Sequence, residues 1–224
     1  MKLSKRLREV AACVPENARV ADIGSDHAKV PIWLVEKGIS DYVVAGEVAL
    51  GPYEIAREAV HARPEIQVRL ADGLSALTEA DAIDCVIIAG MGGLLIAEIL
   101  AAGNLSGLTT LILQPNNHEE ALRRWLNRQN FTLSEEKMVA DKGKIYEIIV
   151  AKRGAQALSE EALRYGNYAR RHPIFRKKWQ FRLTEIAKVL EILKMSDAAS
   201  SQAESEKLRA EKIEIERMLS NENQ

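Results

Sequence analysis

Residues 19–28, Arg19-Val20-Ala21-Asp22-Ile23-Gly24-Ser25-Asp26-His27-Ala28, decide the fold of this 224-residue chain. The first half of the stretch is largely apolar, which favours a buried strand, and Gly24 ends that strand in a turn. Asp22 lies near the end of the strand, and Asp26 lies in the turn that follows. This order predicts the first strand of an α/β domain, leading into a ligand-binding loop.

Two classes of nucleotide-type ligand could bind such a loop. A dinucleotide loop reads G-x-G-x-x-G, which lets backbone N–H groups hold a pyrophosphate, but here only Gly24 is in place. Asp22 and Asp26 would also repel a pyrophosphate at close range. S-adenosylmethionine instead carries a sulfonium and an ammonium group, which carboxylates can accept. We therefore expect its methionine end to contact Asp22, Gly24, Ser25, Asp26 and His27. The alternative is that the two acids only cap the next helix.

Strands and helices alternate outward from this stretch. We predict parallel strands at residues 20–23, 42–47, 68–70, 85–89 and 110–113, with helices between them, and a hairpin of strands at 132–139 and 145–151. A first helix capped by Ser4 precedes them. The pattern predicts a doubly wound, Rossmann-like sheet of about seven strands over residues 1–154, which is the layout of class I methyltransferases.

Composition restricts the class of protein. Hydrophobic residues make up 47% of the chain and the formal net charge is −1, so any nucleic-acid contact must come from a local patch. Cys13 and Cys85 lie in apolar surroundings without metal-ligand spacing, and we expect both to be reduced core thiols. The charged N-terminus and the lack of a long apolar run predict a cytoplasmic protein without signal peptide or membrane span. We expect a monomer.

Acidic residues or glycines follow the next three strands as well. Glu47 ends the second strand and has two oxygens to accept both ribose hydroxyls of an adenosine, while Asp72, with Gly73, ends the third and could accept the adenine amino group. The fourth strand runs into a turn that lets ligands approach the backbone, formed by Gly90, Met91 and Gly92. Because ligands of open α/β sheets bind at the carboxyl ends of the strands, this joint occurrence predicts a methyltransferase.

The acceptor side of the predicted site argues for a ring nitrogen. Enzymes that methylate exocyclic amines often carry N/D-P-P-Y after the fourth strand, and this chain has glycines there. A ring nitrogen such as N1 of adenine loses no proton before attack but becomes cationic, so a carboxylate could stabilise it. Asp72 and Asp26 are the catalytic candidates. Gln114 and Asn116 could bind the edge of a base, or the segment could simply shape a turn.

Two histidines also fall in loops after strands. His27 could contact a ligand or serve the start of a helix, and His118 carries less argument. The four histidines form no cluster with cysteines or carboxylates, so the sequence predicts no metal site.

The pattern changes after Gly154. Apolar residues recur at helical spacing from Phe175 to Leu193 and again from Leu208 to Leu219, separated by a polar break at 196–205, which predicts a helical hairpin or short coiled coil over residues 155–224. Residues 164–194 carry nine basic and two acidic side chains, with aromatic residues between them. This patch predicts contact with an RNA backbone, whose candidates are Arg170, Arg171, Arg176, Lys177 and Lys178. A solvated helix face is the alternative.

The chain resembles the bacterial TrmK family over nearly its whole length. The resemblance rests on short blocks, of which D-I-G-S-D-H-A and G-M-G-G are the most specific: residues 3–7 (LSKRL), 22–28 (DIGSDHA), 46–48 (GEV), 51–52 (GP), 72–74 (DGL), 88–93 (IAGMGG), 113–116 (LQPN) and 143–147 (GKIYE). It implies an enzyme that methylates N1 of adenosine 22 in the D-arm region of tRNA with S-adenosylmethionine, built from a methyltransferase domain and a C-terminal coiled coil. The alternatives from the residues alone are an NAD-dependent oxidoreductase and a non-catalytic RNA-binding module.

Overall fold

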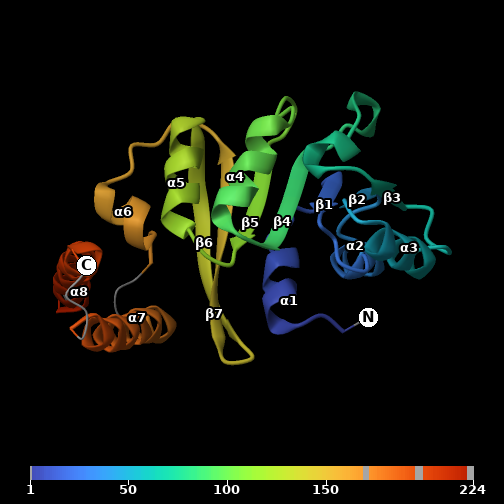
Figure 1. Cartoon of the computed structure of the whole chain (residues 1–224). Helices are drawn as coiled ribbons and strands as arrows, with labels where there is room; N and C mark the ends of the chain where they lie inside the picture. The colour runs from blue at the N-terminus through green and yellow to red at the C-terminus, as the bar shows by residue number, and fades with distance from the viewer. Residues whose placement is uncertain (1, 169–171, 195–198, 221–224) are drawn as a thin grey trace. The chain divides into compact units, whose positions relative to one another are not determined.

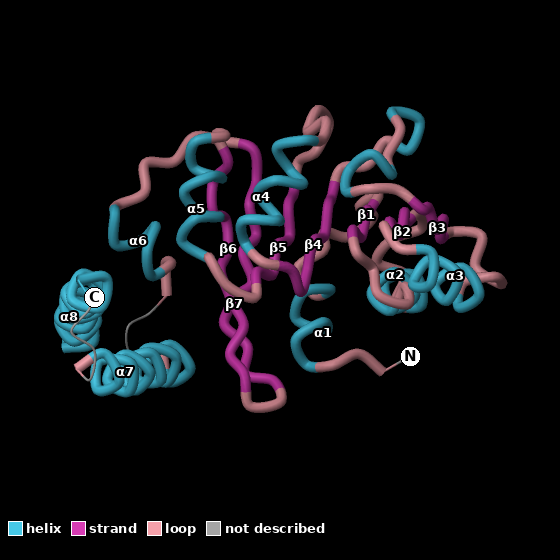
Figure 2. The backbone as a smooth tube through the Cα atoms, viewed as in Figure 1, coloured by secondary structure: helices cyan, strands magenta, loops and turns pink. Residues whose placement is uncertain are grey.

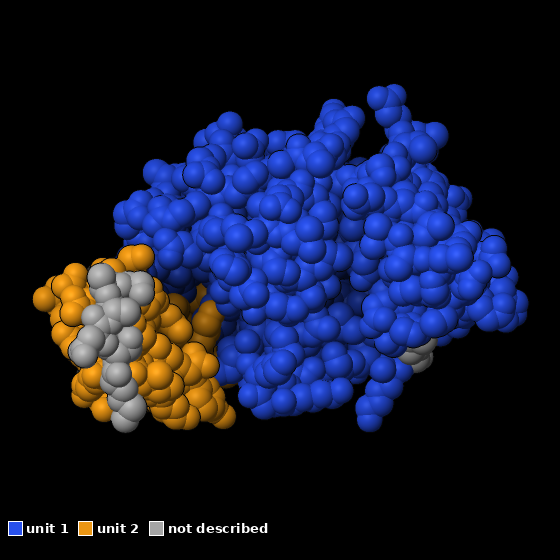
Figure 3. Space-filling view, viewed as in Figure 1, with its two compact units in different colours: residues 1–166 blue, residues 167–224 orange. Residues whose placement is uncertain are grey.

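The computed structural model describes residues 2–168, 172–194 and 199–220. The chain forms two compact units, residues 1–166 and residues 167–224, coloured separately in Figure 3.

The first unit contains a seven-stranded sheet, which confirms the predicted fold class (Figure 1). The strand order is β3-β2-β1-β4-β5-β7-β6, and β7 alone runs antiparallel to the other six strands. The strands are β1 (Val20–Ile23), β2 (Val43–Glu47), β3 (Ile66–Leu70), β4 (Cys85–Met91), β5 (Thr110–Pro115), β6 (Phe131–Asp141) and β7 (Lys144–Arg153). Each predicted strand is present, with bounds that differ by a few residues.

Helices cover both faces of this sheet. One apolar core lies under α1 (Lys5–Ala11), α2 (Lys29–Glu36) and α3 (Leu50–Ala59), and the other lies under α4 (Gly93–Ala102) and α5 (Glu119–Arg128). Successive residues of the central strand β4 enter opposite cores, Ile87 the first and Ile88 the second. This alternation explains why β4 is apolar throughout, because both of its faces are buried.

The β6–β7 hairpin is held to the sheet by a buried ion cluster. Arg123 of α5 donates through Nε to Glu136 of β6 at 2.7 Å and through Nη2 to Glu147 of β7. The three side chains are only 1–2% exposed. Removing one partner of a buried ion pair leaves an uncompensated charge and typically costs about 3–5 kcal/mol. The cluster therefore fixes the strand whose start carries Tyr146.

A short helix extends the first unit beyond the predicted boundary at residue 154. Helix α6 (Glu160–Tyr165) is joined to α5 by an ion pair between Glu160 and Arg124 at 2.6 Å. The Gln156 side chain accepts a hydrogen bond from the Leu133 N–H at 3.1 Å, and Leu158 packs against the core under α4 and α5. These contacts place residues 155–166 with the sheet.

The second unit is a pair of antiparallel helices, α7 (Pro173–Leu193) and α8 (Ala199–Ser220), shown in Figure 2. Arg176, near the start of α7, donates to the carbonyl of Leu219 at the end of α8 at 3.1 Å, and Arg182 pairs with Glu211 at 2.7 Å. The predicted hairpin is confirmed. The predicted break at 196–205 is wrong for residues 199–205, which are helical because α8 gains packing against α7 that outweighs the modest helix propensity of its serines.

Candidate active site

The ends of four parallel strands meet at one edge of the sheet. In the register, Ile23 of β1 lies beside Gly46 of β2 and Ile88 of β4, and Glu47 of β2 lies beside Leu70 of β3. The loops that follow β1, β2, β3 and β4 are therefore neighbours. These loops and the strand ends before them contain the acidic residues and glycines that the sequence predicts for ligand binding.

The loop after β1 has an unusual backbone. Gly24 has a φ of +70°, and its N–H donates to the Gly46 carbonyl at 2.8 Å. Asp26, His27 and Ala28 then follow with φ values of +44°, +70° and +53°. Three consecutive non-glycine residues in the left-handed region cost free energy, and such strain is typical of ligand-binding loops held by their surroundings. The helix α2 begins directly after them, as predicted.

Two buried carboxylates hold this loop through hydrogen bonds. Asp22 is 4% exposed and accepts a hydrogen bond from the Ser25 hydroxyl at 2.8 Å, while Glu47 is 6% exposed and accepts the Asp26 N–H at 2.6 Å. Burial raises the pKa of Asp22 to about 7, and it also raises the pKa of Glu47. The Glu47 carboxylate adds to the cost of ionising Asp22, and the Asp26 carboxylate adds to the cost of ionising both. A cation bound beside them would reduce that cost.

Asp26 is the exposed acid of the loop. The His27 ring nitrogen Nδ1 donates to its carboxylate at 2.6 Å, and the Lys29 ammonium lies 3.3 Å away. Partial burial raises the pKa of Asp26, but the hydrogen bonds from His27 and Lys29 outweigh burial and bring that pKa below its ordinary value. Asp26 therefore presents a carboxylate that stays ionised at neutral pH.

The segment Gly90–Gly93, which spans the end of β4 and the start of α4 and is called the glycine loop here, allows close approach of chain segments. Gly90 forms an irregularity in the register between β4 and β5 and has a φ of +85°. A Cβ atom on Gly24 would collide with the Met91 side chain, and one on Gly93 would collide with the backbone of residues 117 and 118. The loops after β4 and β5 thus come together here because Gly93 lacks a side chain, whereas the end of the flexible Met91 side chain could move away from a Cβ atom on Gly24.

Asp72 and Gly73 lie at the outer end of this edge. Asp72 is exposed, and its backbone carbonyl accepts the Ser75 hydroxyl at 2.6 Å. It follows the edge strand β3, whereas Asp26 follows β1, which pairs directly with β4. Asp26 therefore follows a strand directly beside β4, whereas two strands separate β4 from the strand that precedes Asp72.

Gln114 and Asn116 occupy different environments. Gln114 is fully buried, accepts a hydrogen bond from Arg6, and donates to the Pro115 carbonyl and the Asn116 side chain. Asn116 is exposed and donates to the Gly90 carbonyl at 2.6 Å. Only Asn116 thus lies at the surface of the glycine loop. Arg6 and Tyr146 were assigned no role from the sequence, although both lie in blocks that carry the resemblance.

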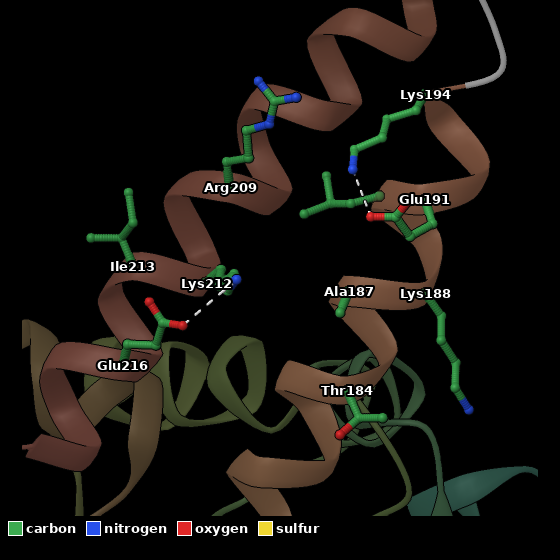
Figure 4. Close-up of a pocket in the computed structure, with 10 residues that line it drawn as sticks. Thr184, Ala187, Lys188, Glu191, Lys194, Arg209, Lys212, Ile213 and Glu216 are labelled. Atoms are coloured by element: carbon green, nitrogen blue, oxygen red, sulfur yellow. Dashed lines mark hydrogen bonds and ion pairs between the residues drawn. The ribbon is translucent and has the colours of Figure 1, made fainter.

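Three of the five basic residues predicted to contact RNA lie on α7. Arg170 and Arg171 fall outside the described residues. Arg176 caps the end of α8, and Lys177 and Lys178 lie over the rings of Phe181 and Trp179 at 5.7 and 5.3 Å. Figure 4 shows an open hollow between α7 and α8 that is lined by four further cations: Lys188, Lys194, Arg209 and Lys212. Lys194 forms an ion pair with Glu191, and Lys212 forms one with Glu216.

Within residues 2–168, 172–194 and 199–220, no group of three or more His, Cys, Asp or Glu side chains could hold a metal ion. In the same part of the chain, no helix combines the length and apolar character that crossing a bilayer requires.

Comparison with known proteins links this geometry to an activity. The family profile described as "TrmK: tRNA (adenine(22)-N(1))-methyltransferase" matches residues 20–222. The Bacillus subtilis (strain 168) tRNA (adenine(22)-N(1))-methyltransferase is 36% identical over 230 residues, which cover 96% of this chain and 95% of that protein. A Streptococcus pneumoniae protein solved in complex with S-adenosyl-L-methionine is 40% identical, with a TM-score of 0.88 and coverage of 97% and 100%. A Streptococcus agalactiae protein of the NADB-Rossmann superfamily is 41% identical, with a TM-score of 0.90 and coverage of 98% of each chain.

Proposed function

The chain belongs to the TrmK family of tRNA (adenine(22)-N(1))-methyltransferases, and from this premise we propose how its own residues serve the reaction. The enzyme transfers a methyl group from S-adenosylmethionine to N1 of adenine 22 in tRNA. Family membership removes the oxidoreductase and the non-catalytic RNA-binding module as alternatives. We place its action in the cytoplasm, where tRNA substrates are found.

The pair of buried acids, Asp22 and Glu47, is the observation that carries the cofactor assignment. Bound S-adenosylmethionine supplies a methyl group on a positively charged sulfur. In our proposal, Asp22 and the loop from Gly24 to His27 hold its charged methionine end, and Glu47 accepts both ribose hydroxyls. The hydrogen bond from the Asp26 N–H to Glu47 ties these two parts of the site together.

The adenine end of the cofactor belongs to the loop after β3. Asp72 follows the edge strand and is exposed, which suits a carboxylate that accepts the adenine amino group. Gly73 has a φ of +53° and lies against Ile99 of α4. We assign Asp72 and Gly73 to this end of the pocket and the glycines after β4, with Met91, to the methyl end.

The acceptor base is assigned to the surface between Asp26 and Asn116. N1 of adenine attacks with a lone pair in the ring plane, and methylation leaves the ring positively charged. The ionised Asp26 can stabilise that charge or take a proton from the neighbouring amino group. Asn116 can hydrogen-bond an edge of the base. The target must leave its stack to reach this surface, as bases do in other enzymes that modify them.

The helical unit is proposed to contact the tRNA backbone. Lys177 is exposed on α7, and the hollow of Figure 4 adds Lys188 and Arg209 along the same hairpin. Phosphate contacts of this kind supply affinity that falls with salt. Arg176 is a weaker candidate for RNA contact than Lys177, because its guanidinium holds the end of α8.

Cofactor binding is expected to tighten as pH rises. Burial raises the pKa of Asp22 to about 7, so below that pH the free protein holds a proton that a cationic ligand must displace. By the same linkage, Asp22 makes the free fold less stable as pH rises from about 4 to 7. Calorimetric titration with S-adenosylmethionine between pH 5.5 and 8.5 should show affinity rising by up to about tenfold per pH unit below 7 and levelling above it.

The Asp22→Asn variant isolates this effect. S-adenosylmethionine has an amino group of its own that titrates, and that contribution is common to both proteins. We expect the variant to bind more weakly at pH 8 and to lose the part of the pH dependence that is due to Asp22. Identical pH profiles for the two proteins would contradict the assignment of Asp22 to the charged end of the cofactor.

A further inference from the structure

Arg6 of helix α1 reaches the acceptor side of the site although it lies before the first strand. Its guanidinium donates through Nη1 to the Gln114 side chain at the end of β5 and lies 5.2 Å from the centroid of the Tyr146 ring. Its backbone N–H donates to the Asp141 carboxylate at 3.1 Å. Figure 1 shows α1 beside the end of β4, in agreement with the contacts between the two elements. One half-buried side chain thus links α1, β5 and the β6–β7 hairpin.

Gln114 is connected to the glycine loop by further hydrogen bonds. Its amide nitrogen donates to the Pro115 carbonyl at 2.8 Å and to the Asn116 side-chain oxygen at 3.2 Å. Asn116 then donates through Nδ2 to the Gly90 carbonyl at 2.6 Å. The Asn116 backbone N–H also binds the Met91 carbonyl at 2.7 Å. A continuous chain of hydrogen bonds therefore runs from Arg6 to the loop after β4.

Arg6 and two backbone carbonyls require the same direction for this chain, because the Pro115 and Gly90 carbonyls can only accept the hydrogen bonds of the Gln114 and Asn116 amide nitrogens. A guanidinium can only donate, so the Gln114 oxygen must face it and the Gln114 nitrogen must face Asn116. That choice in turn directs the Asn116 oxygen toward Gln114 and its nitrogen toward Gly90. Without the guanidinium, the oxygen of the fully buried Gln114 side chain would lose the donor that Arg6 supplies, and the Gln114 amide would no longer be held from that side. The Tyr146 ring holds the guanidinium in place from another side.

We propose that Arg6 is a positioning residue for methyl transfer: through Gln114 it fixes Asn116 and the Gly90 loop in the orientation that receives the target adenine. This inference rests on the proposed acceptor surface between Asp26 and Asn116. Arg6 acts through Gln114 rather than on the base, because a guanidinium against a ring that becomes cationic would oppose the reaction. A Cβ built on Gly90 would lie 3.4 Å from Arg6 Nη1, so the two are close neighbours.

The test compares Arg6→Ala with Arg8→Ala, since Arg8 is an exposed arginine on the same helix. Steady-state kinetics with unmodified tRNA should show kcat lowered about 10- to 100-fold by Arg6→Ala, a size typical of misplaced catalytic geometry. S-adenosylmethionine affinity, measured by calorimetry, should stay within about twofold. Arg8→Ala should leave kcat unchanged. Arg6→Lys should recover only part of kcat, because a single ammonium cannot reproduce the planar contact.

A double variant shows whether Arg6 works through Gln114. Arg6→Ala and Gln114→Ala together should lower kcat no further than the more damaging single change, since both break the same chain of hydrogen bonds. Melting temperatures of all variants identify loss of folding, and if Arg6→Ala unfolds the protein, Gln114→Ala and Arg6→Lys carry the test. Full additivity, or a kcat for Arg6→Ala equal to that of Arg8→Ala, would overturn the inference. Failure of the wild-type protein to methylate adenine 22 would instead overturn the proposed function.

Discussion

Replacing Glu47 with alanine is expected to weaken S-adenosylmethionine binding about 100-fold or more. In our account the Glu47 carboxylate accepts two ribose hydroxyls, and hydrogen bonds to a charged group contribute roughly 1.5–3 kcal/mol each. Tenfold in affinity corresponds to about 1.4 kcal/mol. The change also removes the acceptor for the Asp26 N–H, which anchors the strained loop after β1. Calorimetric titration with S-adenosylmethionine measures the loss.

Two controls keep this result specific. Glu54→Ala removes an exposed glutamate from α3 and should leave the cofactor affinity unchanged. Affinity for unmodified tRNA, measured by fluorescence anisotropy, should change less than about twofold in either variant, because neither substitution alters the α7–α8 helices to which we assign the tRNA contact. Glu47→Ala protein that is folded and binds S-adenosylmethionine as tightly as the wild type would refute the ribose assignment.

The second large effect separates the two carboxylates that the sequence left as catalytic candidates. Asp26→Asn is expected to lower kcat about 100-fold, since loss of one group that stabilises developing charge typically costs 100- to 1000-fold and a neutral amide keeps part of the contact. The change preserves the backbone N–H that binds Glu47, so S-adenosylmethionine affinity should fall by no more than about threefold.

Asp72→Asn should show the opposite pattern. Loss of a charged acceptor for the adenine amino group should weaken S-adenosylmethionine binding about tenfold, while kcat at saturating cofactor stays near the wild-type value. Rapid-quench or steady-state kinetics at several cofactor concentrations distinguishes the two variants. If Asp72→Asn lost turnover at saturating cofactor and Asp26→Asn did not, the roles assigned here would be reversed.

Much of the fold could be predicted because burial leaves a direct mark on the sequence. The central strand β4 is apolar at every position from Cys85 to Ala89, and β1 ends where Gly24 begins the turn. In the hairpin turn after β6, Gly143 has the positive φ that a glycine favours. The start of α8 was misjudged, since the run of small polar residues at 199–205 does not show that it belongs to a helix packed against α7.

The site was less accessible to sequence reasoning because its side chains meet only in three dimensions. Gln114 was expected to face the base, yet it is fully buried and bonded to Arg6, which lies 108 residues earlier. No local pattern shows which face of a strand end a glutamine occupies. The left-handed conformations of Asp26, His27 and Ala28 were equally invisible, since none of these residues is a glycine. The acidic residues at the ends of successive strands, by contrast, could be found because each lies beside its own strand in the sequence.

The site moves a methyl group from S-adenosylmethionine to N1 of adenine 22 in tRNA. The most direct measurement incubates the purified protein with labelled S-adenosylmethionine and an unmodified tRNA transcript, then locates the product by primer extension and nucleoside analysis. A matched transcript with guanine at position 22 serves as the control. We predict 1-methyladenosine with a primer-extension stop at position 22 in the first transcript and no label in the second. Label at another position or in another nucleoside, or equal labelling of both transcripts, would contradict the account.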